Sequence, residues 1–309
     1  MKNLSKLKIT FIFCLLSCTI PGVTPVISLV AGISFGLLLQ NPFPGASSLW
    51  SKSLLQVAVI ALGFGLPLSQ VLHQAWEALP LTVTGITMTV VMGYFLGRLF
   101  HIESKIAALI SFGTAICGGS AIAAMAPAIK AKDEEISISL ATVFSLNALA
   151  LVIFPVIGHR LGMSQESFGI WAGLAIHDTS SVVGAASNYG IVALSVATTV
   201  KLARALWITP FVMIGSYFSK SDERSSFPYF ILGFLTAAII RTFFPELNNL
   251  WEILAGLGRQ ILVVTLFLVG AGLSRQVLAK VGFKPLFLGI VLWTIASLFS
   301  FIAIQNGWI

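Results

Sequence analysis

Eleven apolar segments, separated by short polar or proline-rich breaks, follow one another along the chain. Roughly 20 apolar residues are needed to cross the roughly 30 Å hydrocarbon core of a bilayer, so most of these segments are long enough to span it. The pattern predicts an all-α polytopic membrane protein with about 9–11 transmembrane segments and inverted repeats. The segments cover residues 7–20, 25–40, 52–72, 79–100, 105–131, 134–159, 167–188, 191–218, 227–244, 251–274 and 285–305.

Two of these segments are interrupted near their middles by residues that favour unwound backbone over helix. Segment 105–131 contains Cys-Gly-Gly-Ser at 117–120, and segment 167–188 contains His-Asp-Thr-Ser-Ser at 177–181. Glycine loses the most conformational freedom when it enters a helix. Short polar side chains form hydrogen bonds with nearby backbone groups and so compete with the hydrogen bonds of the helix. Each segment is therefore predicted to be either a broken helix that crosses the membrane or a re-entrant hairpin, and both alternatives stay open.

Lysine and arginine residues at the segment ends predict the orientation of the chain. If segment 105–131 is a hairpin, Lys130 and Lys132 lie inside and Arg160 lies outside; if it crosses, these three exchange sides. The two arrangements differ by a single positive residue, so the charges do not choose between them. Both predict a multi-pass protein of the bacterial inner membrane with a cytoplasmic N-terminus and a periplasmic C-terminus.

The first apolar segment has two interpretations. Lysines at 2, 6 and 8 precede it, and Leu-Leu-Ser-Cys at 15–18 resembles a lipoprotein cleavage site, which is typical of a signal peptide. We favour a short transmembrane helix within 1–24, because a polytopic protein does not need a cleaved signal. Whether the segment is cleaved stays open.

Composition narrows the class of protein. Charged residues make up 9% of the chain, hydrophobic residues 57%, and the mean hydropathy is +0.97, whereas ordinary soluble domains carry about 25% charged residues. A soluble fold is excluded, and the lipid bilayer is the expected surrounding. The net charge of +7 is dispersed among apolar runs and does not indicate a nucleic-acid partner. The three cysteines have no metal-ligand spacing, so we expect no metal and no cofactor.

Internal repeats organise the chain. Residues 54–66 match 261–273, and residues 115–120 match 175–180. The first match is called the outer repeat pair and the second the inner repeat pair. C-terminal to the inner repeat pair, a further match aligns Phe144 with Lys201 and Asn147 with Arg204. Repeats with discontinuous helices are typical of secondary transporters, and chance similarity among small residues is the alternative for the inner pair. We predict an N-terminal transmembrane helix at 1–24, a first scaffold repeat at 25–100, a core with both interrupted helices at 101–218 and a second scaffold repeat at 219–309.

Four ionisable side chains lie inside the apolar segments, where each costs about 2.5–3.5 kcal/mol on insertion scales. His177 and Asp178 lie at the second break, and Lys201 and Arg204 share one helix face in the next segment. An anion, a carboxylate or backbone carbonyls must neutralise the two cations. One interpretation is a structural ion pair between Asp178 and Arg204. The other is a net positive substrate-binding site at Lys201 and Arg204, with His177 or Asp178 as a proton-coupling group.

The breaks supply a second way to bind an anion, because an interrupted helix exposes N–H groups and a positive dipole end where its second half begins. Small residues can instead allow close packing of helices. This alternative is stronger for the glycines of the outer repeat pair, whose motifs at 63–65 and 270–272 contain no charged residue. We predict that these glycines are hinges or supports of the site. The predicted anion donors are Gly118, Gly119, Ser120, Thr179, Ser180 and Ser181, and the predicted hinges are Gly63, Gly65, Gly270 and Gly272.

An enzyme is the weakest alternative. Ser120 and His177 could form a Ser-His pair as in intramembrane serine proteases, but Ile122 stands where those proteases have glycine. The chain also lacks the His-Glu-x-x-His motif of metalloproteases. We expect a protein that is not an enzyme.

The two motif blocks resemble the bacterial YeiH family, whose members carry the name of sulfate exporters. This resemblance implies an inner-membrane protein related to the cation:proton antiporter and anion transporter superfamily. Sulfate, sulfite or an organosulfonate would fit the same cationic site. The resemblance extends from about residue 20 to the C-terminus and is carried by residues 115–124, 132–135, 171–173, 177–181, 183–186 and 201–204.

Together these features predict a secondary transporter that exports a small sulfate-like or sulfite-like anion by alternating access. An anion channel and a structural or regulatory membrane protein are the alternatives. Either H⁺ or Na⁺ could be the coupling ion, a homodimer is an open alternative, and the substrate and the direction of transport stay open.

Overall fold

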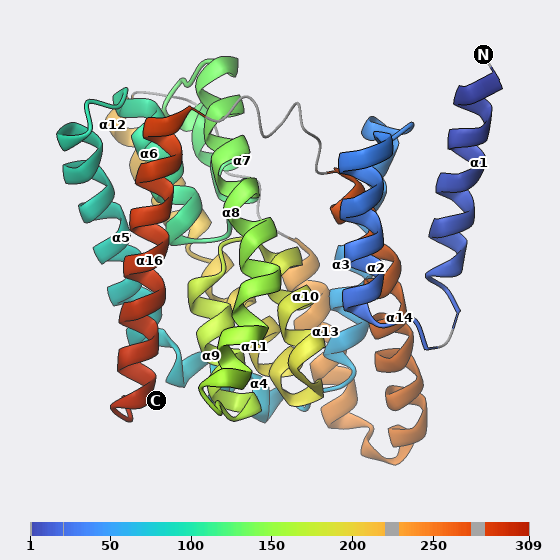
Figure 1. Cartoon of the computed structure of the whole chain (residues 1–309). Helices are drawn as coiled ribbons and strands as arrows, with labels where there is room; N and C mark the ends of the chain where they lie inside the picture. Colours follow the sequence, from blue (N-terminus) through green and yellow to red (C-terminus); the bar gives the residue numbers. More distant parts are fainter. Residues whose placement is uncertain (1, 21, 220–228, 273–281, 309) are drawn as a thin grey trace. The chain divides into compact units, whose positions relative to one another are not determined.

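The computed structural model describes residues 2–20, 22–219, 229–272 and 282–308, and all regular structure in these ranges is helical (Figure 1). Within the same ranges, six helices are long and apolar enough to cross a membrane, and shorter apolar helices accompany them. The prediction of an all-α polytopic membrane protein is confirmed. The six are Pro44–Gly63, Leu79–Leu99, Asp133–Arg160, Ile191–Tyr217, Pro245–Gly272 and Phe283–Gln305.

The chain divides into two compact units. The first unit comprises Met1–Val71 and Tyr229–Val277, and the second comprises Leu72–Pro228 and Leu278–Ile309. Helix α4 (Leu68–Glu77) begins in the first and ends in the second. The first unit contains α1 (Lys2–Ser17), α2 (Pro25–Ser34), the π-helical η1 (Phe35–Leu39), α3 (Pro44–Gly63), α13 (Tyr229–Phe243), the short 3-10 helix η2 (Pro245–Leu247) and α14 (Asn248–Gly272). The second unit contains α5 (Leu79–Leu99), α6 (Ser104–Ala115), α7 (Gly119–Ala128), α8 (Asp133–Arg160), α9 (Gln165–Ala175), α10 (Thr179–Tyr189), α11 (Ile191–Ala205), α12 (Ile208–Ser219) and α16 (Phe283–Gln305).

The boundaries of these units differ from the division expected from the repeats. Residues 72–100 and 278–309 belong with the interrupted helices, whereas the repeat alignment groups them with the flanking scaffold. The cause is packing: α5 lies against α6, and α16 lies against α5, α6 and α9. Gly93 on α5 permits this approach, because a Cβ there would collide with Ser111 on α6. The second unit is therefore larger than the predicted core.

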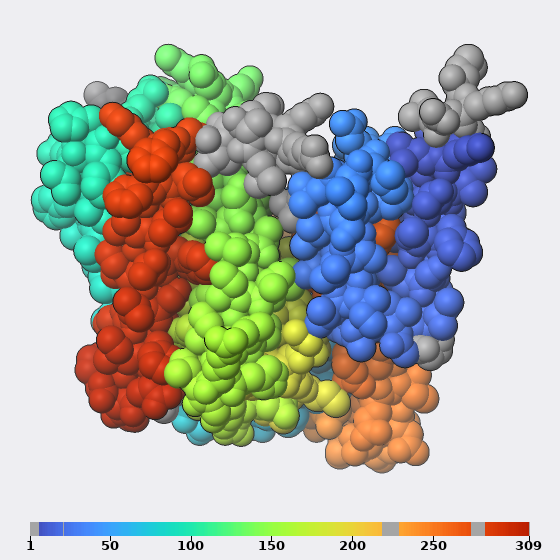
Figure 2. Space-filling view, viewed as in Figure 1, coloured from blue at the N-terminus to red at the C-terminus, as the bar shows by residue number. Residues whose placement is uncertain are grey.

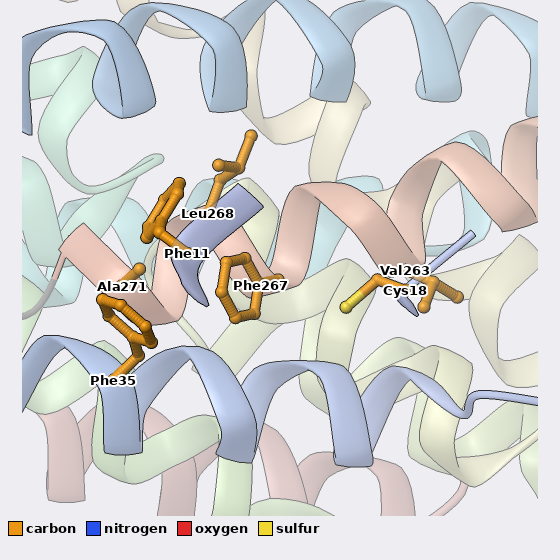
Figure 3. Close-up of a cluster of buried hydrophobic side chains, with 7 residues drawn as sticks. All are labelled: Phe11, Cys18, Phe35, Val263, Phe267, Leu268 and Ala271. Atoms are coloured by element: carbon orange, nitrogen blue, oxygen red, sulfur yellow. The ribbon is translucent and has the colours of Figure 1, made fainter. Parts of the chain in front are cut away.

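The first unit is built on α14, which packs against α2 and α3. A cluster of buried apolar side chains also joins α1 and η1 to α14 (Figure 3). The Phe11 ring centroid lies 5.2 Å from that of Phe35 and 5.3 Å from that of Phe267. The N-terminal helix is thus part of the packed core of this unit. The cluster comprises Phe11, Cys18, Phe35, Val263, Phe267, Leu268 and Ala271.

Large apolar side chains are exposed on the outer surfaces of the helices. On α16, whose surface is red in Figure 2, the side chains of Phe283, Leu298 and Ile302 are all more than half exposed. A soluble protein rarely leaves such extended apolar surface in water. This surface is the one that a lipid bilayer would cover.

Candidate functional site

The first interrupted segment is a re-entrant hairpin, here called the first hairpin. Helix α6 has 12 residues and α7 has 10, and residues 116–118 form the unwound tip between them. The chain comes back to its starting point, because Lys105 Nζ donates a hydrogen bond to the Lys130 carbonyl at 2.6 Å. Each arm is about 15–18 Å long, or about half of the hydrocarbon core. A hairpin with arms of this length reaches about half-way across the hydrocarbon core.

The second interrupted segment is also a hairpin, here called the second hairpin. It consists of α9, the tip 176–178 and α10. Its base is closed by the Tyr189 hydroxyl, which donates to the Met163 carbonyl at 2.6 Å, and by stacking of the Phe168 and Tyr189 rings at 3.8 Å. The choice between crossing and returning segments, which the sequence leaves open, is thus decided in favour of hairpins in both cases.

The two hairpins point toward each other from opposite faces of the membrane. Helix α8 joins their bases, and its 28 residues span about 42 Å. Figure 1 shows α6 and α7 near one end of α8, and α9 and α10 near the other. The tips meet, since a Cβ placed on Gly118 would lie 3.2 Å from the Asp178 Cα. The inner repeat pair is therefore inverted.

Lys201 and Arg204 lie on α11 and bind the carbonyl ends of the first helix of each hairpin. Lys201 Nζ donates to the carbonyls of Ile116 at 2.9 Å and Ile176 at 2.7 Å. Both cations are buried, with 0% of Lys201 and 2% of Arg204 exposed. The guanidinium donates from Nε to Ala115 at 2.6 Å, from one terminal nitrogen to Leu174, and from the other to Thr114 at 3.4 Å.

These contacts change the role expected for the two cations. The C-terminal end of a helix carries a partial negative charge and unpaired carbonyls, and Lys201 and Arg204 neutralise both at α6 and α9. The expected ion pair between Asp178 and Arg204 is absent from the described part of the chain. A substrate could contact the cations directly only by displacing carbonyl bonds. Of the neutralising groups considered from the sequence, the structure selects the carbonyls.

Asp178 caps the start of α10. Its Oδ2 accepts hydrogen bonds from the backbone N–H of Ser180 at 2.9 Å and of Ser181 at 3.2 Å, and from both serine hydroxyls. Thr179, like the two serines, is buried. The amides of Ser180 and Ser181, which the sequence suggested as anion donors, are thus already bound to a carboxylate of the chain itself.

The start of α7 is different. Its N-cap residue is Gly118, with φ +69° and no side chain to cap the helix. Its first N–H groups have no partner inside the helix. The Cys117 sulfur accepts the backbone N–H of Ala121 in the first turn. Ser120 is exposed and Gly119 is half-buried. Of the donors predicted from the sequence, Gly118 already donates its N–H to the Gly113 carbonyl at 2.8 Å. Within the described ranges, the N–H groups of Gly119 and Ser120 remain available to an anion.

Three buried polar side chains near the tips have unpaired atoms in the part of the chain that the structure describes. Both ring nitrogens of His177, the Asn147 amide nitrogen and the Thr114 hydroxyl lack a hydrogen-bond partner. His177 is 1% exposed, and its ring centroid lies 6.4 Å from that of Trp293. The sequence singled out His177 but not Asn147 or Thr114. The signal for Asn147 was its alignment with Arg204 in the repeat.

The four glycines predicted as hinges lie in the first unit, on α3 and α14 or directly after α3. A Cβ on Gly63 would lie 2.5 Å from the Phe234 carbonyl oxygen, and one on Gly270 would lie 2.7 Å from the Leu29 carbonyl oxygen. A Cβ on Gly65 would lie 3.0 Å from the Leu62 oxygen, whereas one on Gly272 meets nothing within 4 Å. Gly63 and Gly270 thus allow close helix packing, and their action as hinges stays a prediction.

Comparison with known proteins identifies the family. The chain matches the family model described as Conserved hypothetical protein 698 over residues 7–289. The chain belongs to this family. Its curated relatives are named UPF0324 membrane proteins, and the family is the YeiH group, so the resemblance found in the motif blocks is confirmed. No solved structure matches the chain.

Relatives of the UPF0324 family cover nearly the whole chain. The protein from Geobacter sulfurreducens is 51% identical over 97% of this chain and 96% of its own length. The protein from Bdellovibrio bacteriovorus is 45% identical over 98% and 95%, and that from Vibrio parahaemolyticus is 47% identical over 94% and 95%. Their names describe membrane proteins. With the apolar helices, they place this chain among multi-pass membrane proteins.

Proposed function

We propose that this protein is a secondary transporter that exports a small anion such as sulfate or sulfite, and that it is not an enzyme. The observation that carries the proposal is the pair of hairpins that enter from opposite faces and meet tip to tip. Unwound backbone at membrane depth is tolerated where it is buried in protein or lines an aqueous path. Opposed half-helices of this kind are typical of secondary transporters.

The balance of charge at the tips favours an anion. Lys201 and Arg204 offset the negative ends of α6 and α9, which leaves the positive starts of α7 and α10 facing the centre. Asp178 supplies one negative charge, so the two cations exceed it. A centre with this balance attracts an anion and repels a cation.

We further propose that protons are the coupling ions and that Asp178 carries them, with His177 as the second candidate. Asp178 is half-buried whereas His177 is fully buried, so a proton from an aqueous path would reach Asp178 more easily. Sodium coupling is the alternative outcome. The hairpin arrangement puts Lys105, Lys130 and Lys132 on one face, which supports a cytoplasmic N-terminus in the inner membrane.

Flux into liposomes tests the proposal. The full chain, purified and reconstituted, is loaded with unlabelled sulfate or sulfite and given the same labelled anion outside. We expect saturable uptake and counterflow, because a transporter exchanges substrate through one site. Empty liposomes are the control. Single-channel currents, or flux that never saturates, would favour a channel, and absence of flux for sulfate, sulfite and methanesulfonate would refute the anion assignment.

The coupling is tested with Asp178→Asn. The amide oxygen of this variant can still cap α10, but the side chain cannot release a proton. We expect anion exchange to persist while uptake no longer responds to a pH gradient. A response equal to that of the wild type would exclude Asp178 and direct the test to His177→Gln.

A further inference from the structure

We propose that Asn147 is a ligand of the transported anion, and that its side-chain amide donates from α8 to an oxyanion held at the start of α7. This inference rests on the proposed transport function and deepens it by naming a binding residue and the chemistry of the ligand. Asn147 lies midway along α8, between the two hairpin bases. It is 3% exposed.

The orientation of the Asn147 side chain is set by one hydrogen bond. Its Oδ1 accepts the backbone N–H of Asp178 at 3.3 Å, so its NH₂ group points away from that bond. This nitrogen is buried and, among the described residues, has no acceptor. Leaving a buried donor unpaired costs about 1–3 kcal/mol. A ligand that supplies an acceptor would recover this energy.

The same face of α8 also lies against the start of α7. Phe144 precedes Asn147 by three residues and therefore lies on the same helix face. A Cβ on Gly119 would lie 2.7 Å from the Phe144 Cζ. A Cβ on Gly118 would lie 3.2 Å from the Asp178 Cα, and Asn147 accepts the Asp178 N–H, so Asn147 and the start of α7 both lie beside Asp178. Because the Phe144 ring lies close against Gly119, the space beside the first turn of α7 suits only a small ligand.

The two hairpins indicate what kind of ligand fits. Asp178 places a carboxylate oxygen on the N–H groups at the start of α10. In the repeat alignment its equivalent in the first hairpin is Gly118, which has no side chain. Within the described residues, the Ala121 N–H has the Cys117 sulfur as a partner, whereas the N–H groups of Gly119 and Ser120 have no carboxylate oxygen. Backbone N–H groups and an amide NH₂ only donate. The matching ligand is a small oxyanion whose oxygens accept.

Helices α8 and α11 contact opposite ends of the hairpin helices. Phe144 and Asn147 align with Lys201 and Arg204 in the repeat. On α11 this pair binds the carbonyl ends of α6 and α9, and on α8 it faces the amide starts of α7 and α10. The cations therefore hold the negative ends in place, and the neutral pair faces the ends where an anion binds.

Binding of sulfate, sulfite and methanesulfonate to the purified full chain tests this assignment, by anion-dependent thermal shift and by the half-saturating concentration of flux. The key variant is Asn147→Asp, which keeps the acceptor for the Asp178 N–H but loses the donor. We expect about tenfold weaker apparent affinity or worse, the effect of losing one hydrogen bond to a charged ligand. Asn147→Leu removes the donor without adding charge and should weaken binding in the same direction.

The matched control is Asn188→Asp, the same chemical change at an exposed residue near the base of the second hairpin. It should bind the anion as the wild type does. Unfolding temperature without anion checks that each variant folds, and if Asn147→Leu does not fold, Asn147→Asp still decides.

The outcomes separate this inference from the transport proposal. Flux in the wild type with unchanged affinity in folded Asn147→Asp would overturn the role of Asn147 and leave transport standing. Binding that Asn147→Asp abolishes, without flux in the wild type, would support the ligand role and overturn transport. Absence of both binding and flux for all three probes would overturn both.

Discussion

The two hairpins have matching sequences at 115–120 and 175–180 but differ at the residue where the second helix begins. In the second hairpin this residue is Asp178, whose carboxylate accepts the first N–H groups of α10. In the first hairpin it is Gly118, with a left-handed φ of +69° and no side chain. The backbone differs at this position as well, with φ +69° and ψ −127° at Gly118 against φ −91° and ψ 142° at Asp178.

This difference shows how two similar hairpins can differ at the start of their second helix. The first N–H groups of α10 have a carboxylate acceptor, whereas those of α7 have none among the residues that the structure describes. A positive helix start buried in a membrane requires an acceptor. At the start of α10 this acceptor is the Asp178 carboxylate. At the start of α7, in the described part of the chain, the Cys117 sulfur accepts only the Ala121 N–H, and the N–H groups of Gly119 and Ser120 are left for an external acceptor. The negative ends, in contrast, are closed in both hairpins, because Lys201 and Arg204 on α11 reach both. The asymmetry is thus confined to the side that attracts anions.

The largest expected effect on stability comes from removing a cation from the carbonyl ends of α6 and α9. Lys201→Met keeps the volume but leaves the Ile116 and Ile176 carbonyls unpaired. Each hydrogen bond to a charged group contributes about 1.5–3 kcal/mol, so we expect a loss of roughly 3 kcal/mol or more and a much lower unfolding temperature in detergent. Thermal unfolding followed by size-exclusion chromatography measures this.

Lys105→Met is the matched control for Lys201→Met. Lys105 also donates to a carbonyl, that of Lys130, but it does so at the hairpin base rather than at the tip. We expect a loss below about 1 kcal/mol, as for exposed charged contacts. If Lys201→Met were as stable as wild type yet inactive, the cation would be a direct substrate ligand rather than a support of the tips.

A smaller effect is expected where the two tips touch. Gly118→Ala places a Cβ 3.2 Å from the Asp178 Cα and in a left-handed conformation. Gly162→Ala, after α8, has the same kind of φ, +63°, but its Cβ meets nothing within 4 Å. A positive φ is unfavourable for alanine in both variants. Gly118 also has ψ −127°, a combination with its φ that glycine adopts far more readily than alanine, so the difference between the two variants reports this backbone conformation together with the contact between tips.

We expect Gly118→Ala to lose about 1 kcal/mol more than Gly162→Ala, the order of magnitude of a single overpacked contact, and to slow anion flux. Chemical denaturation of both variants, with flux measured in parallel, gives the comparison. Equal losses would mean that the tips separate without cost and that their contact does not define the site.

Much of the fold could be predicted from sequence, because bilayer thickness and hydrophobic length are tightly linked. The interruptions at 117–120 and 177–181 were found because glycine and short polar residues stand out in apolar runs. That the two interrupted segments fold back as hairpins could not be predicted from these residues. It depends on contacts such as Lys105 with the Lys130 carbonyl, and positive charges distinguish the two arrangements by one residue only.

The candidate site was only half predictable. Intramembrane charge drew attention to Lys201, Arg204, His177 and Asp178, all of which the structure places at or near the tips. The backbone carbonyls that bind Lys201 and Arg204 could not be predicted, because every residue has a carbonyl and the sequence does not show which ones lie near a cation. Asn147 was missed as a site residue for a related reason: a neutral amide in an apolar helix costs less than a charge and attracts less notice.

The smallest expected effect lies at the base of the first hairpin, where Glu103 precedes α6. A hydrogen bond to the Glu135 carboxylate raises the pKa of Glu103 above its usual range, because two carboxyl groups can share a bond only when one holds a proton. The bond therefore stabilises the base at low pH and is lost as pH rises through the raised pKa.

Glu103→Gln supplies a donor at every pH, so its unfolding temperature should depend less on pH between about 4 and 7 than that of the wild type. Glu166→Gln, at an exposed position in the first turn of α9, is the control at the base of the other hairpin and should keep the wild-type profile. Parallel profiles for all three proteins would show that the shared proton does not hold the base. The two hairpins would then differ at their tips and not at their bases.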